Sequence, residues 1–153
     1  MSDGPKIKGN PLLVSVYLLV ICYVIGEFVI PKYSLLYPIN LIGILGLVIS
    51  LVFFFSGFNI FKSYTENPVP TSSSERLIKT GVFAYTRNPI YLSLVLFHLS
   101  MFLVFENVMY LLSAVGQTIW IHNYIIKFEE EYLLGKFTDE YQRYMNAVSC
   151  WLF

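Results

Sequence analysis

The stretch TGVFAYTRNPIYLSL, residues 80–94, decides how this chain folds, because a polar triplet in it stands directly before a long apolar run. Arg87, Asn88 and Pro89 precede residues 90–105, which carry no charge. Proline suits the first position of a helix, where its missing N–H would have no partner. An asparagine before proline is a good N-cap. The triplet therefore predicts an apolar helix that begins at Pro89 and is capped by the side chain of Asn88.

Three other runs are equally poor in charge. Residues 11–30 carry only Glu27, and residues 37–58 and 108–126 carry no charge. A membrane span needs about 17–25 apolar residues, so these three runs are long enough. Residues 90–105 are short, or tilted in a hairpin with 108–126. We expect one all-α, multi-pass membrane domain with four transmembrane helices, in which charged residues are only 13% of the chain.

The basic residues predict the orientation of the four spans. An even number of spans puts both termini and the long loop, residues 59–89, on one side. Lys32 is the only basic residue expected on the other side. Cytoplasmic segments carry the excess of lysine and arginine, so we expect both termini in the cytoplasm, at a bacterial inner membrane or the endoplasmic reticulum. The residues on the basic side are Lys6, Lys8, Lys62, Arg76, Lys79, Arg87, Lys127, Lys136 and Arg143.

The two segments outside the spans differ in character. Residues 63–77 are rich in serine, threonine and proline, so we expect irregular structure, with a tight turn at Gly81. After the fourth span, apolar residues recur every three or four positions between charges. This pattern predicts an amphipathic helix on the cytosolic membrane surface, with a break near Gly135. The zero net charge gives no indication of a nucleic-acid partner.

Arg87 and two glutamates form a candidate site. A helix that begins at Pro89 offers free backbone N–H groups, and Arg87 would complete an anion site. Glu129 and Glu130 follow the fourth span, on the same side and at the same depth. Together these groups could hold a zwitterionic ligand. The alternatives are an arginine that reaches the membrane surface beside aromatic anchors, and a solvated acidic face, which we favour for Glu131.

Histidines and cysteines give weaker signals. His98 and His122 lie within predicted spans, where polar residues are functional candidates that could contact a substrate head group or carry protons. The alternative is a hydrogen bond between helices, which we favour for both. Cys22 and Cys150 lack the spacing of metal ligands, so we predict no metal site.

The motifs together resemble one family. After ENPVP in the long loop, the chain reads LIKTGVFAYTRNPIYLSL and then EEEYLLGKFTDEYQRYMNAVSCW. This order resembles the integral membrane methyltransferases related to isoprenylcysteine carboxyl methyltransferase and the phospholipid methyltransferases, over residues 60–153. The matching residues are Gly81, Arg87, Asn88, Pro89, Tyr91, Glu129, Glu130, Leu133, Phe137, Tyr141 and Tyr144.

The resemblance implies S-adenosylmethionine as cofactor and a lipophilic or lipidated substrate that arrives from the bilayer. It implies catalytic roles for Arg87 and Glu130. The chain departs from the family at Asn88, where histidine is common, at Thr138, where glycine is usual, and at Cys150, where a basic residue precedes Trp151. The residues implied to bind the cofactor are Gly81, Tyr85, Arg87, Asn88, Pro89, Tyr91, Glu129, Glu130, Leu133, Tyr141 and Tyr144.

Two other functions stay open at this point. Sterol and steroid reductases, which use a nicotinamide cofactor, are similar in their C-terminal halves. A membrane scaffold that retained the fold without activity is the non-enzymatic alternative. The oligomeric state cannot be derived from the pattern.

Overall fold

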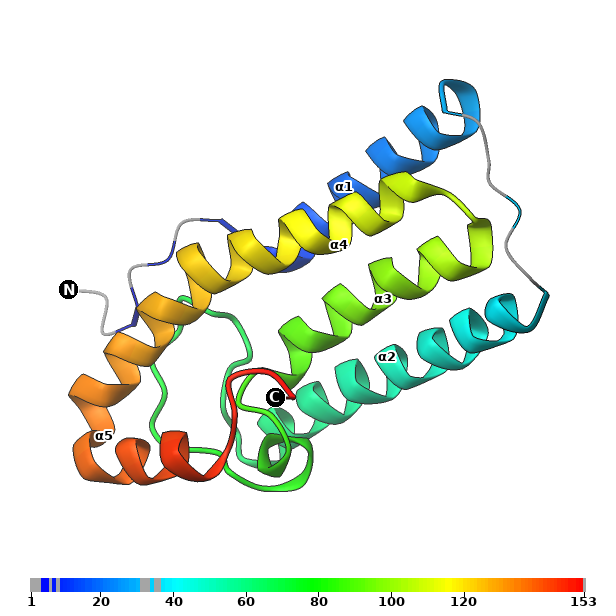
Figure 1. The fold of residues 1–153 in the computed structure, drawn as a ribbon. Helices are drawn as coiled ribbons and strands as arrows, with labels where there is room; N and C mark the ends of the chain where they lie inside the picture. Colours follow the sequence, from blue (N-terminus) through cyan, green and yellow to red (C-terminus); the bar gives the residue numbers. More distant parts are fainter. Residues whose placement is uncertain (1–3, 6, 8, 31–33, 35–36, 153) are drawn as a thin grey trace.

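Helices are the only regular secondary structure in the part of the chain that the computed structural model describes, which is residues 4, 5, 7, 9–30, 34 and 37–152 (Figure 1). The prediction of an all-α fold is confirmed for these residues. The elements in order are α1 (Pro11–Phe28), α2 (Tyr37–Ser63), the short 3-10 helix η1 (Gly81–Ala84), α3 (Pro89–Phe105), α4 (Val108–Ile121), the π-helical segment η2 (His122–Ile126) and α5 (Lys127–Ala147).

Two of these helices, α1 and α2, are long and apolar enough to cross a membrane. Helix α2 has 27 residues and continues past the apolar run to include Lys62 in its last turn. Helix α3 has 17 residues, and α4 has 14 residues before the π segment. The four-span topology therefore stays a prediction. Most of the predicted connection 31–36, and also Lys6, Lys8 and Lys32, lie outside the described residues.

Helix α3 lies between α2 and α4, and α1 packs against α4 (Figure 1). The face of α2 toward α3 carries small residues at seven-residue steps, Gly43, Ser50 and Gly57, and these are the buried residues of α2. A Cβ atom on Gly57 would lie 2.7 Å from Cγ1 of Ile90, and one on Gly43 would lie 2.9 Å from Cβ of Leu103. Small residues thus let the two backbones approach closely, as is common between helices in membranes.

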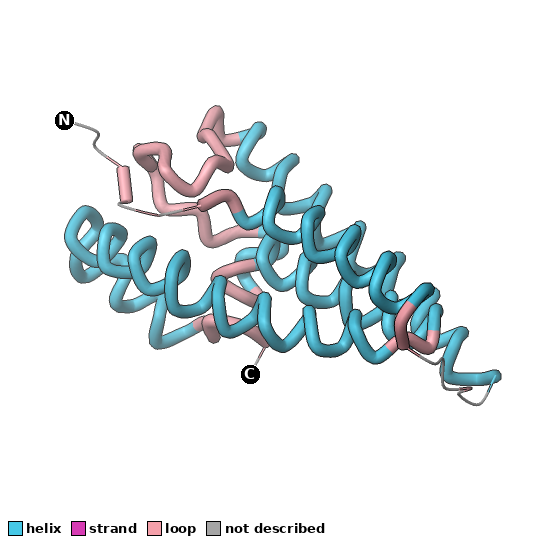
Figure 2. The backbone as a smooth tube through the Cα atoms, turned by 90° about the horizontal axis from the view of Figure 1, so that it is seen from above, coloured by secondary structure: helices cyan, strands magenta, loops and turns pink. Residues whose placement is uncertain are grey.

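The long loop and α5 gather at one end of the helix bundle (Figures 1 and 2). Helix α5 continues from η2 and bends at Thr138, whose φ of 44° and ψ of −118° are not helical. A break was predicted near Gly135. Gly135 itself stays helical, since a single glycine costs a helix only about 1 kcal/mol, and the break lies three residues later, at Thr138. Thr138 is the position at which the resemblance implies glycine.

A buried apolar cluster joins α3 to the junction of α4 and α5. Its members are Tyr91, Ile121, Ile125 and Ile126, and the three isoleucines are fully buried. Trp120 and the C-terminal residues Cys150 and Trp151 pack against it. The cluster fixes the start of α3 relative to the start of α5, and these two helix starts carry the predicted site.

Candidate functional site

The loop between α2 and η1 is irregular, as predicted, but several hydrogen bonds fix its shape. Thr65 and Gly81, at its two ends, have φ values of 58° and 60°, and the turn predicted at Gly81 is confirmed. The Glu66 carboxylate accepts hydrogen bonds from the backbone N–H of Glu75, at 3.1 and 3.2 Å. The N–H of Ser74 donates to the hydroxyl of Tyr132 on α5, at 3.3 Å. The loop is therefore attached to the first half of α5.

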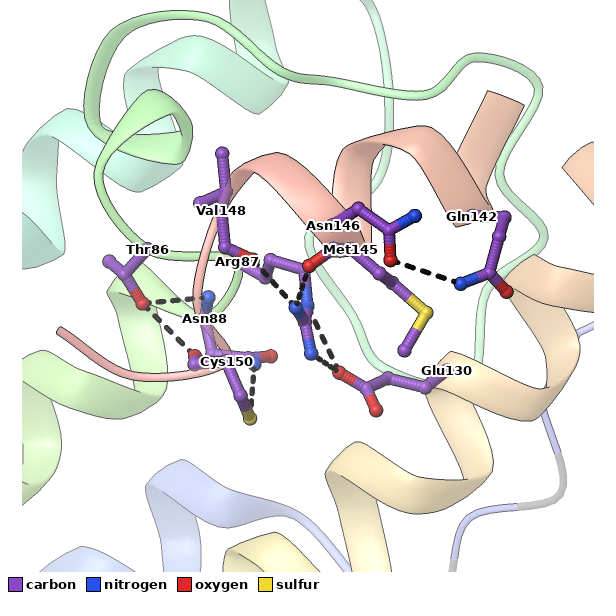
Figure 3. A network of polar contacts seen from close by, with 9 residues as sticks. All are labelled: Thr86, Arg87, Asn88, Glu130, Gln142, Met145, Asn146, Val148 and Cys150. Carbon is purple, nitrogen blue, oxygen red and sulfur yellow. Dashed lines mark hydrogen bonds and ion pairs between the residues drawn. The ribbon is translucent and has the colours of Figure 1, made fainter. Parts of the chain in front are cut away.

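Asn88 precedes α3 but does not cap it, so the predicted side-chain cap was wrong. Its amide instead donates to the backbone carbonyl of Cys150, at 3.0 Å. The buried Thr86 hydroxyl donates to the same carbonyl, at 3.1 Å. The Asn88 side chain thus binds the C-terminal segment instead of the first N–H groups of α3. These hydrogen bonds hold the C-terminal segment against the residues that precede α3 (Figure 3).

Arg87 is the centre of this network (Figure 3). Its Nε and Nη2 donate to one carboxylate oxygen of Glu130, at 3.1 and 2.6 Å. Its Nη1 donates to the backbone carbonyls of Met145 and Val148, at 3.1 and 2.6 Å. The two side chains of the ion pair are only 9% and 19% exposed. Burial acts to lower the pKa of Arg87, but the bond to Glu130 and its charge outweigh this, and the pKa is raised.

Glu129 has a different partner from its neighbour. One of its carboxylate oxygens accepts a hydrogen bond from the Tyr91 hydroxyl, at 2.8 Å. Burial raises the pKa of Glu129 to about 8, although the Tyr91 hydrogen bond acts in the opposite direction. This carboxyl group is therefore poised to change its charge near neutral pH.

Two tyrosines from the end of α5 complete the site. Tyr141 and Tyr144 are buried, and their ring centroids lie 6.0 Å apart. The Tyr144 hydroxyl donates to the backbone carbonyl of Phe83 in η1, at 2.6 Å. Burial raises the pKa of both tyrosines, so each keeps its proton and can donate a hydrogen bond.

These groups surround one pocket of about 120 Å³. The residues that line the pocket include nine of the eleven predicted cofactor residues, namely Arg87, Asn88, Pro89, Tyr91, Glu129, Glu130, Leu133, Tyr141 and Tyr144.

Gly81 and Tyr85 do not line this pocket. Gly81 lies against Ile60 of α2, where a Cβ atom would come within 2.4 Å of its Cδ1 atom. Tyr85 follows η1 with its side chain directed outward, 72% exposed. Both belong to the segment that leads into α3, and neither contributes to the wall of the pocket.

The two histidines lie away from the pocket. His98 is fully buried and contacts the hydroxyls of Ser15 on α1, at 2.9 Å from Nε2, and Ser113 on α4, at 2.7 Å from Nδ1. Because Ser113 donates its own hydrogen to the carbonyl of Tyr110, its oxygen accepts from Nδ1–H, and Ser15 donates to Nε2. His98 thus makes hydrogen bonds between helices, which is the interpretation that we favoured from the sequence over contact with a substrate. His122 begins the π segment.

Several pocket residues were not predicted. They come mainly from the loop that was expected to be irregular and was given no function, and from α5 beside the glutamates. The motif ENPVP, noted only as part of the resemblance, was the signal that could have found the loop wall. The unpredicted residues with polar side chains are Asn67, Ser72, Ser74, Arg76 and Tyr132. Among the described residues, no group of histidines, cysteines and carboxylates could hold a metal ion.

Comparison with known proteins identifies a family. A family model described as phospholipid methyltransferase matches residues 39–140, which is 102 of the 153 residues. The match extends from α2 through the loop and α3 to Glu140 in α5, and so includes both helix starts of the site. No curated protein and no solved structure matches the chain.

Proposed function

Because this chain belongs to the phospholipid methyltransferase family, we propose that it uses S-adenosylmethionine to methylate a lipophilic acceptor at the cytosolic face of a membrane. One observation carries the proposal. Two motifs about 40 residues apart in sequence, at the starts of α3 and α5, line a single pocket and are in contact through Arg87 and Glu130 at 2.6 Å. The family match favours a methyltransferase over a nicotinamide-dependent reductase.

The residues of the pocket fit this cofactor. S-adenosylmethionine is a nucleoside joined through a cationic sulfonium to a zwitterionic amino-acid end, and it supplies a methyl group that the sulfonium already activates. Glu129 offers a carboxylate with no cationic partner among the described residues. Aromatic rings of Phe83, Tyr91 and Tyr132 line the same space and can stack on a flat base. Charge and shape therefore agree with the ligand that the family implies.

The protein contributes alignment and shelter. Because the leaving group is activated, methyl transfer needs no nucleophilic side chain, and alignment of two reactants can contribute up to about 7–11 kcal/mol. Arg87 and Glu130 hold the end of α5 against the start of α3, and Tyr144 holds α5 to η1. We propose that Arg87 and Glu130 support catalysis in this way, by positioning the walls that bind the reactants and exclude water.

Calorimetry with S-adenosylhomocysteine on detergent-solubilised protein tests the proposal. Above the Glu129 pKa of about 8, where this group is charged, Glu129→Gln removes the charge but keeps the shape of the side chain. A hydrogen bond to a charged group contributes about 1.5–3 kcal/mol, so we expect binding to weaken by roughly 10- to 150-fold. Glu131→Gln is the matched control, because Glu131 is exposed and does not line the pocket. Its affinity should equal that of the wild type.

Two outcomes would contradict the proposal. The first is wild-type protein that does not bind S-adenosylhomocysteine at millimolar concentration. The second is equal weakening by Glu129→Gln and Glu131→Gln, which would assign the effect to net charge rather than to the pocket. Incorporation of a tritiated methyl group into extracted membrane lipid, without loss of nicotinamide absorbance, then separates a methyltransferase from a reductase.

A further inference from the structure

The motifs predicted that Arg87 would bind an anionic group of the ligand, but the charged residues around the pocket are paired differently. Two arginines and two glutamates line it, namely Arg76, Arg87, Glu129 and Glu130. Arg87 and Glu130 neutralise each other at 2.6 Å. The remaining bonds of the Arg87 guanidinium go to backbone carbonyls at the end of α5. Four of the five N–H donors of Arg87 are therefore already used, and its charge is neutralised by Glu130, so Arg87 has little left to offer an anion.

Arg76 is the other cation that lines the pocket. Among the described residues, no carboxylate or carbonyl forms an ion pair or hydrogen bond with it. The nearest basic residue along the chain, Lys79, is already paired with Glu140, at 2.5 Å. Arg76 is thus an exposed cation at the wall of the pocket, unpaired among the described residues, whereas the pocket's second cation is held in an ion pair.

The backbone on both sides of Arg76 is held in place. Two residues before it, Ser74 is bonded to Tyr132 on α5, and Glu75 is bonded to Glu66 across the base of the loop. Two residues after it, Ile78 is buried, with 6% of its surface exposed. The side chain of Arg76 therefore extends from a fixed point of the pocket wall.

We propose that Arg76 is the oxyanion-binding residue of this pocket and takes a carboxylate or phosphate group of the bound ligand, while Glu129 takes the cationic end. The inference rests on the proposed function and identifies the group that recognises the anionic part of its ligand. A guanidinium presents N–H donors in a planar fork that matches a carboxylate or a phosphate. Two ligands carry this chemistry here: the amino-acid end of the cofactor and the phosphate of a phospholipid.

Calorimetry on the full-length protein with three probes tests the inference and separates the two sources. The probes are S-adenosylhomocysteine, adenosine, which lacks the amino-acid end, and dihexanoyl phosphatidic acid. If the anion is the cofactor carboxylate, Arg76→Gln weakens the binding of S-adenosylhomocysteine by at least roughly tenfold and leaves the binding of adenosine unchanged. Roughly tenfold is the lower end expected for loss of a charged hydrogen bond. If the anion is a lipid phosphate, the same variant weakens only the binding of phosphatidic acid.

Arg143→Gln is the matched control, because Arg143 is an exposed arginine on α5 that does not line this pocket. Wild-type affinity of Arg76→Gln for both anionic probes would overturn the inference. A loss shared equally by Arg76→Gln and Arg143→Gln would also overturn it, since that result reflects overall charge. Wild-type protein that binds neither nucleoside would contradict the proposed function instead, and phosphatidic acid would still decide the role of Arg76.

Discussion

Replacing Arg87 with methionine should destabilise the protein more than any other single change in the network that it forms. Methionine keeps the length of the side chain and removes its donors. Breaking one partner of a buried ion pair costs about 3–5 kcal/mol, and two carbonyls at the end of α5 also lose their donor. Because the Glu130 side chain is 19% exposed, water can solvate its carboxylate in the variant, and this offsets part of the loss. We expect a decrease in the free energy of unfolding of about 3–4 kcal/mol.

Thermal unfolding in detergent, followed by tryptophan fluorescence, measures this effect. Trp120 and Trp151 pack against the cluster that holds Tyr91, so their emission reports on the region around the network. For a domain of about 150 residues, 1 kcal/mol corresponds to roughly 2–4 °C, so the expected decrease in Tm is roughly 6–16 °C. Arg143→Met on the exposed face of α5 is the control and should change Tm by less than about 2 °C.

A double-mutant cycle with Glu130→Leu completes the test. The two single variants should each be destabilised, and the double variant should lose less than the sum, because neither partner is left alone in a buried place. The reasoning would be refuted if Arg87→Met changed Tm no more than Arg143→Met. Additive losses would show that Arg87 stabilises the fold through the carbonyls of Met145 and Val148 rather than through Glu130.

Three further perturbations have expected outcomes. Thr138→Gly should raise the free energy of unfolding by about 1 kcal/mol, because a β-branched residue is strained at a φ of 44°; equal effects of Thr138→Gly and Thr138→Ala in thermal unfolding would argue against strain. Affinity for S-adenosylmethionine should rise as pH increases from 6.5 through about 8, as Glu129 loses its proton and gains the charge that attracts a cation; a profile in calorimetry that Glu129→Gln leaves unchanged would exclude this cause. His98→Leu should lower stability by about 1–3 kcal/mol through two lost hydrogen bonds; unchanged Tm would contradict a structural role.

Protonation of Glu129 should also make the stability of the chain depend on pH, but stability should fall as pH rises, whereas affinity for the cofactor increases. A carboxyl whose pKa is raised in the folded state binds its proton more tightly there than in the unfolded chain. The free energy of unfolding that Glu129 contributes in this way is fully present below its pKa in the unfolded chain, near 4.5. It is lost as pH rises through the pKa in the folded chain, about 8. Thermal unfolding between pH 5 and 8.5 should therefore show a decline in Tm that Glu129→Gln reduces.

Local chemistry made much of the site predictable. Proline and an uncharged run located the start of α3, and three consecutive glutamates located the start of α5. Both starts were expected at the same depth of one membrane face, with Arg87 and the glutamates on either side of a ligand, so their proximity was predicted but their direct ion pair was not. The structure places them 2.6 Å apart.

The features that could not be predicted depend on contacts between distant segments. Asn88 has the residue type and position of an N-cap, yet a carbonyl 62 residues away takes its amide. The bend at Thr138 is marked by no residue that favours positive φ. Arg76 lies in a segment whose composition predicts only irregular structure, and its place in the pocket depends on the bond between Ser74 and Tyr132. Single-sequence patterns contain none of this information.

Ultraviolet cross-linking of tritiated S-adenosylmethionine to the detergent-solubilised protein, followed by peptide mapping, tests the central claim most directly. The pocket is built from the loop after α2, the start of α3 and the start of α5. The account predicts label in peptides that contain residues 67–91 or 129–144, and competition by unlabelled S-adenosylhomocysteine. Competed label confined to peptides of α1 or of the first half of α2 would contradict it.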